Sequence, residues 1–159
     1  MEQSKRIKIF IASPGDVVSE RERVRKVCDK LNQSPMIRNT GVHLKAAGWE
    51  DAVPQPGDPQ DIINSILTTA DIIICIFHKR LGSPTRNYLS GTVEEFTRAY
   101  ESWTNRKQPH ISLFFKDPVI RDESERDDPQ FKALMSFKKK VQTERLVLYK
   151  NFSDTQTFE

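Results

Sequence analysis

The sequence predicts a flavodoxin-like α/β domain with three layers, in which helices cover both faces of a five-stranded parallel sheet in the order 2-1-3-4-5. Short apolar runs of strand length alternate along the chain with segments whose apolar residues recur at helical spacing. One run, 72–77, is apolar throughout, which is typical of a central parallel strand covered on both faces. This alternation implies right-handed βαβ units, and five strands joined in this way favour that order.

Each predicted strand is a short apolar or alternating run bounded by turn-forming residues. In the first of them Ile7, Ile9 and Ile11 alternate with other residues, and the run ends at a Ser-Pro-Gly breaker. The expected strands are 7–11, 42–46 leading to Gly48, 72–77, 111–115 and 146–149.

Capping residues mark the predicted helices. Thr92 and Glu95 fit a capping box, in which the glutamate would accept a hydrogen bond from the backbone N–H of Thr92. The helices are expected to start at Asp16, at Asp58 or Pro59, at Thr92 and near Phe131. Residues 153–156 carry another helix-start signal three residues before the sequence ends. We therefore expect 1–159 to be a single domain, the N-terminal piece of a larger protein with its last helix cut.

Length, charge and composition exclude several functional classes for this chain. The chain has 159 residues, so one domain is expected. Its formal charge is only +3 and its basic and acidic residues are mixed, so direct nucleic-acid binding is not expected. Cys28 and Cys75 both lie in apolar patterns, which indicates buried, reduced thiols. No apolar run is long enough to span a bilayer. These features predict a cytoplasmic protein with no membrane partner.

The predicted topology also indicates where a ligand would bind. In open parallel sheets, ligands bind beyond the carboxyl ends of the strands where the strand order reverses, here between the first and third strands. The loops expected there are 13–16 and 78–92, with Trp49 on the same edge.

Glu95 is the candidate catalytic residue of this site. On the first turn of its helix it would stay ionised, because a helix N-terminus favours negative charge. An ionised carboxylate beside a cleft can stabilise or attack an oxocarbenium-like centre. The structural alternative is that Glu95 only completes the capping box with Thr92.

The other candidates are ligand-binding residues, and each has a structural alternative. Ser13 and the backbone amides that follow it could contact a phosphate or ribose, or form an ordinary turn. Asp16 could be a helix cap. Arg21 could pair with Glu95 or with a phosphate, or be an ordinary solvated or ion-paired residue. Trp49 could stack on a base or pack under the loop. The predicted ligand-binding set is Ser13, Gly15, Asp16, Arg21, Trp49, His78 and Thr92. No spacing of residues predicts a metal site, since the acidic cluster in 122–128 lacks EF-hand spacing.

Five motifs occur in an order that resembles an uncharacterised bacterial TIR-like family, found at the N-terminus of STAND-type NTPases. They are IFIASPGD at 9–16, ERE at 20–22, ADIII at 70–74, HKRLG at 78–82 and SGTVEEF at 90–96. The resemblance covers residues 7 to about 115.

The wider group to which that family is similar includes TIR domains and nucleoside 2-deoxyribosyltransferases. In both, a glutamate at the position that Glu95 matches acts on an N-glycosidic bond. The resemblance therefore implies a signalling or defence domain that binds a nucleotide such as NAD, or a nucleoside, as a possible substrate and needs no other cofactor. The Trp-Cys pair that precedes the glutamate in many NAD-cleaving TIR domains is absent, so the substrate stays open.

A non-catalytic role is the second interpretation. TIR-like domains also self-associate, so the chain could be an interaction module that forms homo-oligomers or contacts C-terminal domains of its own full-length protein. Catalysis and assembly are compatible with each other.

Overall fold

The computed structural model describes residues 4–158, and their strands form one parallel sheet. The sheet has five strands in the order β2-β1-β3-β4-β5, and each neighbouring pair is parallel. The strands are β1 (Lys5–Ala12), β2 (Val42–Gly48), β3 (Ile72–Phe77), β4 (His110–Lys116) and β5 (Tyr149–Phe152). The predicted strand order is therefore confirmed.

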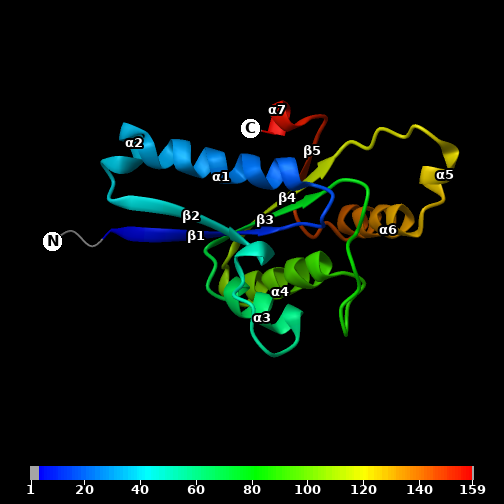
Figure 1. Cartoon of the computed structure of the whole chain (residues 1–159), viewed down its shortest axis with the longest axis horizontal. Helices are drawn as coiled ribbons and strands as arrows, with labels where there is room; N and C mark the ends of the chain where they lie inside the picture. The colour runs from blue at the N-terminus through cyan, green and yellow to red at the C-terminus, as the bar shows by residue number, and fades with distance from the viewer. Residues whose placement is uncertain (1–3, 159) are drawn as a thin grey trace.

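Helices cover both faces of the sheet, which gives the three predicted layers. In the view of Figure 1, α1, α2 and α7 lie above the sheet, whereas α3 and α4 lie below it. Residues of α6 pack in the same core cluster as those of α4. The helices are α1 (Val18–Gln33), α2 (Pro35–Arg38), the 3-10 turn η1 (Trp49–Asp51), α3 (Pro59–Leu67), α4 (Gly91–Arg106), α5 (Glu123–Arg126), α6 (Pro129–Glu144) and α7 (Thr155–Phe158). Among residues 4–158, none of these helices combines the length and the apolar character needed to cross a membrane.

The central strand β3 divides the core between the two layers of helices. Ile73, Cys75 and Phe77 pack with residues of α4 and α6 on one face. Ile76 packs with residues of α1 on the other face. Both faces are covered, which is why the sequence of β3 is apolar without alternation.

The fifth strand begins three residues later than predicted. Arg145 ends α6 in a left-handed conformation with φ 50, and Leu146 N–H then donates to Val141 O at 3.2 Å. This turn uses the apolar residues 146–148 as a connection, and pairing with β4 starts only at Tyr149. Leu148 is consequently 96% exposed.

Both cysteines are buried and unpaired, as the apolar pattern around them predicted. The helix start predicted near the end of the sequence is also present. Asp154 Oδ1 accepts a hydrogen bond of 2.8 Å from Thr157 N–H at the beginning of α7.

Candidate functional site

A cavity of about 490 Å³ opens at the carboxyl ends of β1 and β3, where the topology placed the site. It is bounded by the turn after β1, by η1, by the first turn of α3, by the loop before α4 and by the start of α4. Of the predicted site residues, Ser13, Gly15, Trp49, Thr92 and Glu95 line it. The chain thus brings five of the eight candidates together.

The helix that carries Glu95 starts earlier than the capping-box pattern predicted. Ser90 is the N-cap, because its Oγ accepts a hydrogen bond of 3.0 Å from Val93 N–H. Thr92 already lies inside α4, so Glu95 belongs to the second turn and does not cap the helix. The capping-box interpretation is therefore wrong, and the side chain is free to line the cavity, where it is 4% exposed.

Burial decides the charge of Glu95. It raises the pKa of this carboxyl to about 8, and the nearby Glu94 adds to the rise. A hydrogen bond from Gln60 and the charge of Arg21 oppose the rise only in part. The expectation of an ionised Glu95 is therefore wrong for the free protein: loss of hydration outweighs the field of the helix N-terminus at this depth.

A chain of amide side chains joins Glu95 to its neighbour Glu94. Gln60 Nε2 donates to Asn64 Oδ1 at 3.1 Å and to Glu95 Oε1 at 3.3 Å, and Asn64 Nδ2 donates to Glu94 Oε2 at 2.8 Å. Glu94 also lies 3.7 Å from Arg98, whereas Glu95 makes no ion pair within residues 4–158. Sequence reasoning missed Gln60 and Asn64, although Gln60 follows the predicted helix start at Asp58 by two positions.

Ser13 contributes a buried hydroxyl to the cavity. It is 4% exposed, and its Oγ has no hydrogen-bond partner among the described residues. Gly15, two residues further along the same turn, is exposed at the rim.

Trp49 lines the cavity, and Arg21 lies behind it against its ring. Trp49 is 46% exposed and does not pack under the loop, and the guanidinium carbon of Arg21 lies 4.8 Å from the centre of its ring. Arg21 forms an ion pair with Glu50, so the structural alternative applies and the predicted pairing with Glu95 is wrong. One face of the Trp49 ring is thus held by Arg21, an arrangement that leaves an aromatic surface beside the cavity.

Asp16 and His78 line a different cavity, of about 540 Å³. Asp16 does not cap α1, whose N-cap is Val17; its Oδ2 instead accepts a hydrogen bond of 3.0 Å from Lys79 N–H. Burial, together with the charge of Lys116, lowers the pKa of His78 and keeps its imidazole neutral near pH 7. These two candidates are therefore separated from Glu95.

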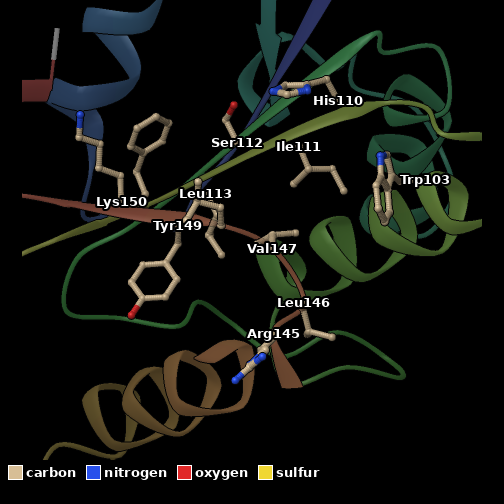
Figure 2. Close-up of a pocket in the computed structure, with 12 residues that line it drawn as sticks. Trp103, His110, Ile111, Ser112, Leu113, Arg145, Leu146, Val147, Tyr149 and Lys150 are labelled. Carbon is tan, nitrogen blue, oxygen red and sulfur yellow. The ribbon is translucent and has the colours of Figure 1, made fainter. Parts of the chain in front are cut away.

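A third cavity, of about 800 Å³, lies along β4 and the segment before β5. Figure 2 shows Trp103 of α4 together with Leu146 and Val147 lining it. Its lining is mainly apolar, and it holds no buried carboxyl or thiol comparable to Glu95. We therefore assign the candidate site to the smaller cavity around Glu95.

No group of three His, Cys, Asp or Glu side chains in residues 4–158 is arranged to hold a metal ion. The chemistry available at the Glu95 cavity is that of a buried carboxyl group, a free hydroxyl, one amide, two guanidinium groups and an aromatic face.

Comparison with known proteins gives a family but no characterised relative. The chain has no significant match among curated proteins or among solved structures. A family model described as "Domain of unknown function (DUF4062)" matches residues 8–159. Since this match spans nearly all of the sequence, the chain belongs to the DUF4062 family.

Proposed function

We propose that this domain is TIR-like and binds a nucleotide such as NAD, or a nucleoside, in the Glu95 cavity and cleaves its N-glycosidic bond. The observation that carries the proposal is the position of Glu95: a carboxyl group that is 4% exposed lines a cavity at the carboxyl ends of β1 and β3. Buried carboxyl groups with strongly shifted pKa values cluster at functional sites. The order of the sequence motifs supports the relation to TIR domains.

Each protonation state of Glu95 suits a different kind of substrate. A substrate with a cationic leaving group, such as the pyridinium of NAD, would favour the ionised form by its charge. The carboxylate would then stabilise the oxocarbenium-like centre while the C–N bond breaks, its electron pair leaving with the neutral base. Water adds to the sugar carbon and releases one proton.

A neutral nucleoside would use the other form of the same group. Protonated Glu95 would donate its proton to the departing base as the C–N bond breaks. The carboxylate that results would accept a proton from the attacking water. The pH profile of cleavage therefore separates the two cases, because activity on a cationic substrate should rise as Glu95 ionises and activity on a neutral one should fall.

The test is product formation from NAD and from nucleosides, followed by chromatography. We expect the Glu95→Gln variant to lose at least about 100-fold in rate, the lower range for a catalytic proton-transfer group. Glu101→Gln is the matched control, since Glu101 is an exposed glutamate on the same helix. Equal rates for Glu95→Gln and the unmodified chain, or no product from any substrate, would overturn the catalytic proposal.

Self-association is a second candidate function, and the free edge of the sheet favours it. β5 is the edge strand next to β4, and the residues before it lack a pairing strand in the described chain. The exposed Leu148 and the apolar cavity of Figure 2 lie at this edge. A second copy could pair here across a two-fold axis.

Light scattering at increasing protein concentration tests this second candidate. The unmodified chain is expected to form dimers or larger assemblies, and Leu148→Glu is expected to remain a monomer. The control is Leu89→Glu, which changes another exposed leucine far from β5 in sequence. A monomer at every concentration would contradict the proposal.

A further inference from the structure

Two buried oxygen atoms at the carboxyl end of β1 lack hydrogen-bond partners among residues 4–158, and they belong to different cavities. Ser13 Oγ is in the wall of the Glu95 cavity. Asp16 lines the neighbouring cavity of about 540 Å³, and its Oδ1 is the second unpartnered atom. A buried polar atom without a partner costs free energy. Asp16 Oδ1 therefore points to a ligand group that donates a hydrogen bond, and the Ser13 hydroxyl points to one that donates or accepts.

Arg80 joins the two cavities. It is exposed, lines both of them, and makes no ion pair or hydrogen bond within the described chain. A guanidinium group with five free N–H donors is suited to a phosphate or pyrophosphate. An anion bound to Arg80 would therefore lie at the boundary of the two cavities.

The neighbouring charges of the second cavity are already largely compensated. Lys79 Nζ lies 3.4 Å from Glu125, and Asp128 accepts hydrogen bonds from the first turn of α6. Phe131 adds a partly buried aromatic ring to the lining. Asp16, His78 and Arg80 therefore remain as the groups available to a ligand, beside an apolar surface.

We propose that the two cavities bind the two halves of one dinucleotide, with its pyrophosphate on Arg80. This inference rests on the proposed function, since one nucleoside half occupies the Glu95 cavity. The other half occupies the second cavity, where a ribose hydroxyl donates to Asp16 Oδ1. Each cavity has a volume within the range of small-molecule sites, which is about 300–1,000 Å³.

Equilibrium binding to the purified chain tests the proposal, with a carbocyclic analogue of NAD that cannot be cleaved as the dinucleotide. AMP, NMN, adenosine and nicotinamide riboside represent its parts. We expect the dinucleotide to bind at least about 10-fold more tightly than either mononucleotide, because its linked halves bind as one molecule. The change in fluorescence of the exposed Trp49 provides one readout, and calorimetry provides an independent one.

Two variants separate the parts of the site. Arg80→Ala should weaken the dinucleotide at least about 10-fold and the two nucleosides less than about 2-fold, since nucleosides lack phosphate. Asp16→Asn retains an acceptor for Lys79 N–H but loses the free carboxylate oxygen, so it should weaken the dinucleotide and AMP while NMN binds as before. The control for charge is Arg6→Ala, at the opposite end of β1, which should change none of these affinities.

The outcomes distinguish this inference from the proposed function. If nucleosides bind but the dinucleotide gains nothing over the mononucleotides, or if Arg80→Ala weakens all ligands equally, the two-cavity site is wrong and the Glu95 cavity still binds nucleosides. If no nucleotide or nucleoside binds, the proposed function is wrong as well.

Discussion

The side-chain nitrogen of Gln60 lies 3.3 Å from Oε1 of Glu95 and donates a hydrogen bond to it. This amide is a hydrogen-bond partner of a buried carboxyl group that has no cation paired with it in residues 4–158. Gln60 itself is held at the start of α3, where Asp58 Oδ1 accepts from its backbone N–H at 2.9 Å. The helix α3 thus orients the candidate catalytic group through a neutral amide and not through a charged side chain.

Replacing Gln60 should change the titration of Glu95. The hydrogen bond from Gln60 lowers the pKa of Glu95, so Gln60→Leu, which keeps a similar volume but cannot donate, should raise that pKa above about 8. Carbon-13 NMR of labelled glutamate side chains measures the titration directly. Gln55→Leu, at an exposed position in the loop before α3, is the control and should leave it unchanged. An unchanged Glu95 titration in Gln60→Leu would contradict the assigned hydrogen bond.

Gly91 should act on Glu95 through Gln60. A Cβ added at Gly91 would lie 2.6 Å from Gln60 Oε1, so Gly91→Ala must displace the end of that flexible side chain. The helix itself should tolerate alanine, whose helix propensity is about 1 kcal/mol better than that of glycine. We therefore expect a raised Glu95 pKa with little loss of stability, measured by NMR titration and urea unfolding. A Gly91→Ala variant with the original Glu95 titration would show that the amide adjusts without losing its contact.

Burial of Glu95 should make stability depend on pH. In the unfolded chain its pKa is near 4.5, whereas in the folded chain it is about 8, so between these values the folded state binds the extra proton and stability falls as pH rises. The loss approaches about 4 kcal/mol by pH 8. Glu95→Gln removes the ionisable group, so urea unfolding at pH 5 and pH 8.5 should show a smaller loss in this variant. Glu101→Gln should lose as much stability between these two pH values as the unmodified chain. An equal loss of stability in all three proteins would contradict the raised pKa.

The fold could be predicted because its signals are local. The run 72–77 is a strand in the structure with the predicted bounds, since a central parallel strand needs apolar residues on both faces. The fifth strand was misplaced for the opposite reason. The apolar residues 146–148 have the composition of a strand, but the turn that ends α6 at Arg145 decides where pairing can start.

The structure has a cavity at the edge of the sheet where the topology predicted a site, but the charge of Glu95 differs from the prediction. Topology brought Ser13, Trp49 and Glu95 to one cavity, as expected for the carboxyl ends of β1 and β3. The capping-box pattern placed the helix start at Thr92, whereas the structure has its N-cap at Ser90. Depth of burial, which sets the pKa of Glu95, depends on α3 packing against α4 and has no local signal.

A buried ion pair at the other side of α1 gives the last prediction. Glu20 is 2% exposed, and its Oε1 accepts from Lys116 Nζ at 2.7 Å and from Thr155 Oγ1 at 3.1 Å. Burial alone would raise the pKa of Glu20, but the hydrogen bond and charge of Lys116 outweigh it and lower the value. This pair therefore joins α1, β4 and α7 through one carboxylate.

Lys116→Met should destabilise the domain by about 3 kcal/mol at pH 7, because it leaves an uncompensated charge in a buried position. The cost should shrink as pH falls, since the unmodified chain loses the contribution of the pair when Glu20 takes up a proton below its lowered folded-state pKa. The double variant Glu20→Gln/Lys116→Met removes both charges and should be more stable than Lys116→Met alone. Urea unfolding at pH 7 and pH 4 measures all three proteins. If the double variant is less stable than Lys116→Met, Glu20 is stabilised by contacts other than this ion pair.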